Sequence, residues 1–360
     1  MNNKDKRGKS RSNPPSTPDL DPASPDSTIG PTGLVAAEAI ASGSGRSFVS
    51  WLSQYALVLV LVALVLFYSL MLPDTFPTVA NLRNIAATQS VLIIMSLGLT
   101  FPLVTGEFDF SFGPVAAFAS SLTAVLTVNE HWALLPAALV VIAACLGIGL
   151  VNSFFIVFIG ISSLITTLGM GTLILGLTLA VTDSAVIAGP PDFLVAATTN
   201  SLFGMPYPVY FSLGLAAIVW FVYGHTSFGR HLYFAGEGPK AAKLSGLPVD
   251  RLRTLAYLIL ALMCAIAGIV NFGRLGSADP NLGISYLLPG TAAVFLGATV
   301  IVPGRFNAWG TVFAVYLLVV GVTGLQLMGG AGYLENIFNG GALVLAVTFA
   351  HLVRRGRTVE

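Results

Sequence analysis

Long stretches without a charged side chain dominate the chain from residue 47 onward. An α-helix needs about 20 apolar residues to cross the hydrocarbon core of a bilayer, and a charge at its centre costs roughly 3 kcal/mol. Nine runs contain no Asp, Glu, Lys or Arg: residues 47–73, 84–106, 110–129, 131–182, 193–229, 254–273, 280–304, 306–334 and 336–353. The pattern predicts an all-α polytopic membrane protein.

Two of these runs are longer than one crossing needs. Residues 131–182 contain the break Gly160-Ile161-Ser162-Ser163, which predicts two helices joined by a tight turn. Helix-breaking residues surround the start of the run at 193–229, and they predict an extended external loop before a helix at about 208–224. These residues are Pro191, Asn200, Gly204, Pro206 and Pro208. The prediction is therefore about ten transmembrane helices.

The positions of lysine and arginine predict the orientation, because these residues favour the cytoplasmic side of a membrane. Six crossings separate the basic residues of the N-terminal segment from those at 230–253, and four more separate these from the basic C-terminus. Even numbers place all three groups on one side, with Arg305 beside them and only Arg83 and Arg274 opposite. Both termini are predicted to be cytoplasmic.

Composition agrees with this assignment and divides the chain into three parts. Charged residues make up 9% of the chain and hydrophobic residues 55%, whereas roughly 25% of an average globular chain is charged. Residues 1–47 are rich in proline, serine and mixed charge, so we expect a disordered cytoplasmic tail. The transmembrane domain covers 48–353, with a cytoplasmic loop at about 225–253, and 354–360 form a C-terminal tail. Membrane lipid is the expected surrounding, and a net charge of +1 indicates no nucleic-acid partner.

Catalytic and cofactor motifs are not evident in the sequence. Gly8-Lys9-Ser10 resembles the end of a phosphate-binding loop, but Asn3 stands where that motif needs glycine. The four histidines lack metal-ligand spacing, and Cys145 and Cys264 lie in apolar runs typical of buried small residues. We therefore expect no enzyme activity, no metal and no cofactor in this chain.

A two-acid interruption separates the runs at 84–106 and 110–129. Its sequence is Thr105-Gly106-Glu107-Phe108-Asp109-Phe110-Ser111-Phe112-Gly113-Pro114. Two carboxylates at the bilayer centre would cost roughly 6 kcal/mol, so the helix is expected to break here. Either Asp109 or Ser111 caps the following helix, or the break lines a translocation path.

The cytoplasmic loop contains a second local pattern. Pro239 and two alanines followed by Gly246 predict a short helix that begins at proline and stops at glycine. Such a helix is suited to docking a cytoplasmic partner, and the alternative is an ordinary solvated basic loop. Glycines at 147, 149, 169, 171 and 176 are expected to allow close helix packing.

Together, these two patterns resemble the membrane permease of a bacterial ABC importer of the ribose and monosaccharide type, over roughly residues 50–357. The break is similar to the family's Gly-Gly-Ile-Asp-Leu-Ser, with matches at Gly106, Asp109, Ser111 and Gly113 and with Glu107 in place of the second glycine. The loop is similar to Phe-Gly-Arg followed by Glu-Ala-Ala-x-x-x-Gly, with Lys240 in place of the acid. Asn152 matches an Asn-Gly step but precedes Ser153, and the acids usual after Tyr286 are missing.

The resemblance implies a multi-pass permease subunit of the bacterial inner membrane that moves a monosaccharide or related polyol by alternating access. Its implied partners are a second permease copy, identical or not, a cytoplasmic twin-cassette ATPase and a periplasmic sugar-binding protein. The implied ATPase-coupling residues are Phe228, Gly229, Arg230, Lys240, Ala241, Ala242, Gly246, Asp250 and Arg251. The residues of the helix break or path are Gly106, Glu107, Asp109, Ser111, Gly113 and Asn152. The alternative is an ion-coupled secondary transporter that uses Glu107 and Asp109.

Overall fold

A computed structural model describes residues 57–357 of the chain. The expected N-terminal tail at 1–47 lies outside the described residues, as do the first residues of the first predicted helix and the last three of the chain. The described part of that first helix covers Leu57–Met71. All described residues belong to one compact unit, Ser50–Glu360.

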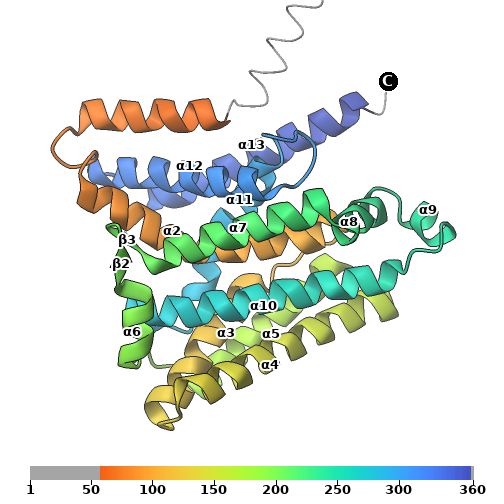
Figure 1. Cartoon of the computed structure of the whole chain (residues 1–360), viewed down its shortest axis with the longest axis horizontal. Helices are drawn as coiled ribbons and strands as arrows, with labels where there is room; N and C mark the ends of the chain where they lie inside the picture. Colours follow the sequence, from red (N-terminus) through yellow and green to blue (C-terminus); the bar gives the residue numbers. More distant parts are fainter. Residues whose placement is uncertain (1–56, 358–360) are drawn as a thin grey trace, which may run out of the picture. The chain divides into compact units, whose positions relative to one another are not determined.

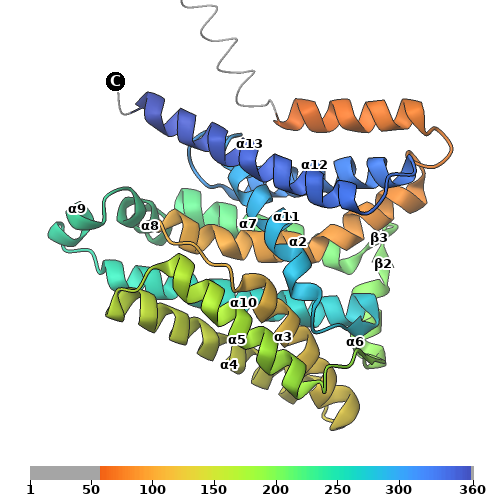
Figure 2. The same cartoon turned by 180° about the vertical axis from the view of Figure 1, so that it is seen from behind.

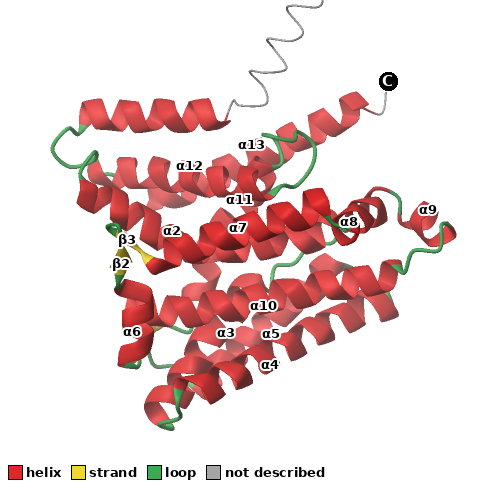
Figure 3. Ribbon diagram, viewed as in Figure 1, coloured by secondary structure: helices red, strands yellow, loops and turns green. Residues whose placement is uncertain are grey.

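Helices form most of the described chain (Figure 3). Two of them continue as short π-helical segments: α3 (Phe112–Ala124) as η1 (Val125–Asn129), and α4 (Leu134–Ser153) as η2 (Phe154–Ile159). The other helices are α2 (Val79–Val104), α5 (Ser163–Val181), α6 (Asp192–Thr199), α7 (Tyr207–His225), α8 (Ser227–Glu237), α9 (Pro239–Leu244), α10 (Val249–Leu275), α11 (Leu282–Gly297), α12 (Ala308–Leu327) and α13 (Tyr333–Arg357). Two antiparallel pairs of two-residue strands connect loops: β1 (Ile187–Ala188) pairs with β4 (Ser277–Ala278), and β2 (Ser201–Leu202) pairs with β3 (Met205–Pro206).

Within the described residues, seven helices are long and apolar enough to cross a membrane. They are α2, α3 with η1, α4 with η2, α5, α7, α10 and α12. Leu57–Met71 and α11 are shorter apolar helices. The predicted all-α polytopic membrane protein is confirmed at this level.

Helix α2 is the most deeply buried of the long apolar helices, and α10 packs beside it in the middle of the bundle. About nine-tenths of the apolar window of α2 is buried (89%), compared with 22% for α4 and α5. Helix α10 packs against α2, α3 and α4, whereas α11 packs against α12 and α13. Figures 1 and 2 show α2 and α10 between the α4–α5 pair and the α12–α13 pair. The exposed leucines of α4 and α5 and the exposed phenylalanines of η2 are therefore placed to face lipid.

Close backbone contacts explain part of the high glycine content. A methyl group added at Gly113 would lie 2.2 Å from the carbonyl oxygen of Gly283, so α3 and α11 touch directly here. A methyl group added at Gly149 would lie 2.9 Å from the β-carbon of Ala261 on α10, so this position is also restricted. The packing prediction is wrong for three glycines, because nothing lies within 4 Å of an added methyl group at Gly147, Gly169 and Gly176.

Two predicted connections can be compared directly with the structure. The chain turns at Gly160, whose φ is +86°, so the 131–182 run does form two helices. The extended loop expected before α7 is wrong, because residues 192–199 form α6. Asp192 lies in the first turn of α6, where a carboxylate stabilises the helix, and Leu194 and Thr198 pack against Gly273 of α10. This tertiary packing stabilises a helix that is too short to be evident from sequence.

Candidate functional site

The break after α2 is formed by backbone geometry at its C-terminus. Pro102 lies inside the last turn, and its carbonyl accepts hydrogen bonds from the amide groups of Thr105 and Glu107 at 3.0 and 2.9 Å. Gly106 then adopts a φ of +86°, a conformation that other residues rarely take. The helix therefore ends three residues before the first acid, so Glu107 and Asp109 are both in the connecting loop.

A hydrogen-bonded chain of three side chains lies at the start of α3. The carboxylate of Asp109 accepts hydrogen bonds from the backbone amide and the hydroxyl of Ser111, both at 2.6 Å. The amide nitrogen of Asn152 on α4 donates to the same hydroxyl at 2.9 Å. All three side chains are buried, and Asp109 is 4% exposed. Asp109 thus satisfies a backbone donor at the start of α3, while Ser111 makes no capping hydrogen bond of its own.

Helix α5 supplies acceptors to the amide groups inside the break. The hydroxyl of Ser163 accepts from the amide of Phe108 at 3.2 Å, and that of Thr167 accepts from the amide of Phe110 at 3.0 Å. A backbone without helical hydrogen bonds is tolerated at membrane depth only where protein or water satisfies it. Ser163 and Thr167 are therefore structural partners of the break that sequence reasoning missed, because their spacing to the break is set only by folding.

The space beside Asp109 is very small. A cavity of about 10 Å³ is bounded by Asp109, Ser111, Asn152, Tyr257 and Cys264 among others. A single water needs roughly 10–15 Å³, so no sugar fits at this point. In this conformation Asp109, Ser111 and Asn152 hold helices together.

The loop after α7 begins with a capped helix. Thr226 accepts a hydrogen bond from the amide of Gly229 at 3.2 Å, which starts α8. Gly229 leaves no space for a side chain, since an added methyl group would lie 2.2 Å from the carbonyl oxygen of Val222. Phe228 packs against the core, and Arg230 is exposed with a hydrogen bond to Ser227. Of the Phe-Gly-Arg pattern, only Arg230 is available to a partner.

The short helix expected near Pro239 is present as α9, and Gly246 follows it with a φ of +81°. Ala242 is buried and anchors α9, whereas Lys240 and Ala241 are exposed. Leu244 is 90% exposed, although it lies at the end of this helix outside the apolar core. Its side chain is free to contact a partner that docks on α9, and sequence reasoning missed it.

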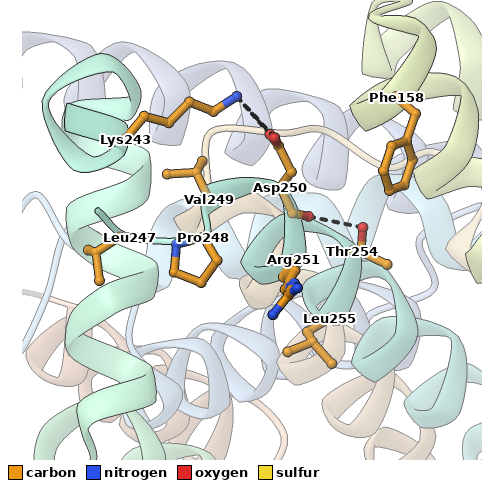
Figure 4. A pocket seen from close by; sticks show the side chains of 9 residues that line it. All are labelled: Phe158, Lys243, Leu247, Pro248, Val249, Asp250, Arg251, Thr254 and Leu255. Atoms are coloured by element: carbon orange, nitrogen blue, oxygen red, sulfur yellow. Dashed lines mark hydrogen bonds and ion pairs between the residues drawn. The ribbon is translucent and has the colours of Figure 1, made fainter. Parts of the chain in front are cut away.

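The connection from α9 to α10 carries exposed charges beside an open pocket. Lys243 and Asp250 form an ion pair at 2.9 Å, and Arg251 is exposed. A pocket of about 570 Å³ lies here; Figure 4 shows Phe158 on one side and Leu247 and Pro248 on the other. Apolar walls with basic side chains at the rim offer a large concave surface to a protein partner.

The loop and the break are in direct contact. Gly236 of α8 lies against the end of α2, and a methyl group added there would lie 1.9 Å from the carbonyl oxygen of Val104. Glu107 of the break forms an ion pair with Arg253 in the second turn of α10. These side chains are 14% and 23% exposed, so the pair is mostly buried. The residues that make these contacts, at the helix break and in the segment from α8 to α10, are more than 120 positions apart in the sequence, and they form one site in the structure.

Helix α8 is also bound to the segment between α11 and α12. The hydroxyl of Tyr233 donates to the carbonyl of Phe306, and burial raises the pKa of Tyr233 to about 12, so this donor stays protonated. Arg305 pairs with Glu237 at 3.3 Å and lies over the ring of Tyr233. A displacement of α8 would therefore act on both the break and the start of α12.

Metal chemistry is not suggested by the described part of the chain, where no three of its His, Cys, Asp and Glu side chains are grouped for metal binding. Cys145 and Cys264 are both buried and free.

The apolar helices, the break and the attached loop together define a polytopic membrane transport protein. Residues 81–347 match the family described as branched-chain amino acid transport system, permease component, and the chain belongs to this family. It is accordingly an inner-membrane permease component. The resemblance seen in the motifs is confirmed.

Similar proteins cover nearly the whole chain. It is 31% identical to the galactose/methyl galactoside import permease protein MglC of Salmonella typhimurium, over 85% of this chain and 96% of the relative. It is 30% identical to the ribose import permease protein RbsC of Escherichia coli, over 84% and 96%. The D-allose transport system permease protein AlsC of Escherichia coli is 27% identical over 86% and 95%. No solved structure matches the chain.

Proposed function

We propose that this chain is the membrane-spanning permease subunit of an ATP-driven importer, and that its cargo is a monosaccharide or related polyol. Similarity to import permeases for galactose, ribose and allose supports this cargo class. The same comparisons favour an importer permease over an ion-coupled secondary transporter. Burial of Asp109 among hydrogen-bond partners and the pairing of Glu107 with Arg253 also favour structural roles for the two acids.

The observation that carries the proposal is the direct contact of α8 and α10 with the helix break. An ATPase docked on α9 would engage Leu244 and the exposed basic residues Arg230, Lys240 and Arg251. Movement of the loop would then reach the break through Gly236 and through the Glu107–Arg253 pair. This is a short physical route from ATP-driven closure to alternating access of the bundle.

We further propose ten crossings with both termini in the cytoplasm. Helices Leu57–Met71, α11 and α13 would add three crossings to the seven long apolar helices. The C-terminal end of α13 lies at the same end of the bundle as α8 and α9, with α6, β2 and β3 at the opposite end (Figure 1). This placement supports a cytoplasmic C-terminus, because α8 to α10 carry the basic loop.

The partners follow from this arrangement. A twin-cassette ATPase would dock at the α8–α9 end, a periplasmic sugar-binding protein would dock at the α6 and β2–β3 end, and a second permease copy, identical or different, would complete the pathway. The chain would carry no cofactor and would catalyse no reaction itself, so ATP hydrolysis belongs to its partner.

A reconstitution experiment tests this function. The chain is purified with its associated ATPase and placed in liposomes, and sugar uptake is measured with ATP, with ATP and a binding protein, or with a proton or sodium gradient alone. We expect uptake only when ATP, ATPase and binding protein are all present. Uptake driven by an ion gradient without the ATPase would contradict the proposal.

A further inference from the structure

A second cavity lies among α2, α11, α12 and α13, away from the helix break. Its volume is about 170 Å³. Polar side chains from three helices line it: Gln89 of α2, Ser285 and Tyr286 of α11, and Glu335 and Asn339 of α13. Gln89 and Asn339 are buried, Tyr286 is half-buried, and Ser285 and Glu335 are exposed, so this is a polar pocket that opens to the surface of the bundle.

Two of these side chains are buried without a protein partner. Asn339 is 5% exposed, and its Oδ1 atom accepts no hydrogen bond. Gln89 is 9% exposed, and its side-chain amide has no hydrogen-bond partner among the described residues. Buried polar groups are normally paired, because an unpaired one loses its hydration without compensation. Two amides with unused hydrogen-bonding capacity therefore line one cavity, and a polar guest would supply the missing partners.

Neighbouring groups in the cavity are held in place by the protein. The amide of Gln326 donates to Oε2 of Glu335 at 3.3 Å, which leaves the other carboxylate oxygen without a hydrogen-bond partner among the described residues. The hydroxyl of Tyr286 is held by Oδ1 of Asn271 at 3.3 Å, and Asn271 is itself buried. The cavity therefore presents fixed acceptors and donors before any guest enters, which lowers the cost of binding.

The lining chemistry selects one class of guest. Amides offer both donors and acceptors, and a carboxylate accepts from hydroxyl groups, so the set suits a molecule with several hydroxyls. None of the described residues that line the cavity is Lys or Arg, so the lining offers an anionic guest no positively charged partner. Leu92, Pro289 and Leu318 supply an apolar wall for C–H groups. At roughly 30 Å³ per water, the space corresponds to about six waters, the scale of a single small ring.

We propose that this cavity binds one monosaccharide ring or a small polyol during transport, with Gln89 and Asn339 as its principal hydrogen-bonding residues. This inference rests on the proposed function and adds a location for substrate inside the permease. The site is distinct from the break, where the space beside Asp109 is too small for a sugar.

The first test measures uptake in intact cells. Cells without the chain receive the wild-type chain or a variant, and initial uptake of radiolabelled D-ribose, D-galactose, D-allose and xylitol is measured. Gln89→Leu and Asn339→Leu keep approximate size and remove the hydrogen-bonding atoms, and we expect each to lower uptake at least about tenfold at equal membrane abundance. Ser96→Ala is the control, because Ser96 is buried on α2 with an unpaired hydroxyl but does not line this cavity.

A second measurement detects binding without transport. The purified chain in lipid nanodiscs is heated with about 100 mM of the imported sugar. A sugar that is not imported, at the same concentration, is the control for osmolyte effects. The imported sugar should raise the unfolding midpoint by roughly 2–4 °C for the wild type and Ser96→Ala. The two leucine variants should show no such difference between the sugars.

The outcomes separate the two proposals. If removal of the chain changes uptake of none of the compounds, the proposed function and the cavity site both fail. If removal abolishes uptake but both leucine variants import within twofold of wild type, the cavity site fails and the permease function stands. If the leucine variants do not reach the membrane, the unfolding midpoint of the wild type decides. A wild-type midpoint that is the same with both sugars would overturn the cavity site.

Discussion

The carboxylate of Glu107 pairs with the guanidinium of Arg253, and this contact joins the break after α2 to the second turn of α10. Glu107 stands where the resembling family carries a second glycine. The extra acid is matched by a basic partner 146 residues away. Because both side chains are mostly buried, either charge without the other would be costly.

Removal of one member of this pair should destabilise the protein. Glu107→Gln or Arg253→Gln leaves a mostly buried charge unpaired, which costs about 3–5 kcal/mol. The thermal unfolding midpoint in detergent should fall for each single variant, and the double variant should recover most of the loss. Equal midpoints for all four proteins would show that the pair contributes nothing.

Contact between α8 and α2 should be sensitive to one methyl group. Gly236→Ala places a carbon 1.9 Å from the carbonyl oxygen of Val104, so the two segments must separate. We expect sugar uptake to fall while the ATPase still binds and hydrolyses ATP, at a stability cost of about 1–3 kcal/mol. Gly224→Ala is the matched control, because an added methyl group there has nothing within 4 Å. If Gly236→Ala couples ATP hydrolysis to sugar uptake as well as the wild type does, the contact between α8 and α2 is not the route from the ATPase to the helix break.

Leu244 should contribute to ATPase binding and not to folding. Its side chain is 90% exposed, so Leu244→Ala should leave the unfolding midpoint unchanged. Burial of a leucine side chain on binding contributes about 1.4 kcal/mol or more, so its loss should weaken ATPase binding roughly tenfold. Titration of the ATPase onto immobilised permease measures this. Phe203→Ala, at the exposed β2–β3 turn, should bind the ATPase like the wild type.

Asp109 should act through the structure of the break. Asp109→Ala leaves the amide and hydroxyl of Ser111 without their acceptor, and loss of such a cap costs about 0.5–2 kcal/mol. Uptake and the unfolding midpoint should fall together, and Asn152→Ala should show a smaller effect of the same kind. A wild-type midpoint combined with lost uptake in Asp109→Ala would indicate direct substrate contact instead.

Much of the fold was accessible from local sequence. Charge-free runs of sufficient length marked α2, α5, α7, α10 and α12, because the cost of a charge in lipid depends on composition alone. Pro239 and Gly246 marked the ends of α9 through their backbone restrictions. Helix α6 was missed, since its stability depends on packing against Gly273 in a helix 80 residues later.

The candidate site was only partly predictable for the same reason. The break and the loop were recognised separately, but nothing local to Gly236 indicates that it touches Val104. Ser163 was assigned only to the turn at 160–163 and Thr167 only to a membrane helix, whereas the structure places both against the amides of the break. Gln89 and Asn339 likewise lie in the charge-free runs 84–106 and 336–353 with no motif around them.

The sequence by itself determined that the protein lies in a membrane, where its chain breaks and which loop carries basic charge, because each follows from the solvation of neighbouring residues. The tertiary structure alone decided which charges pair, which glycines have neighbours and which polar side chains share a cavity. Those outcomes depend on contacts between helices far apart in the chain, and a hydrogen bond or ion pair exists only once both partners are brought within a few ångströms of each other.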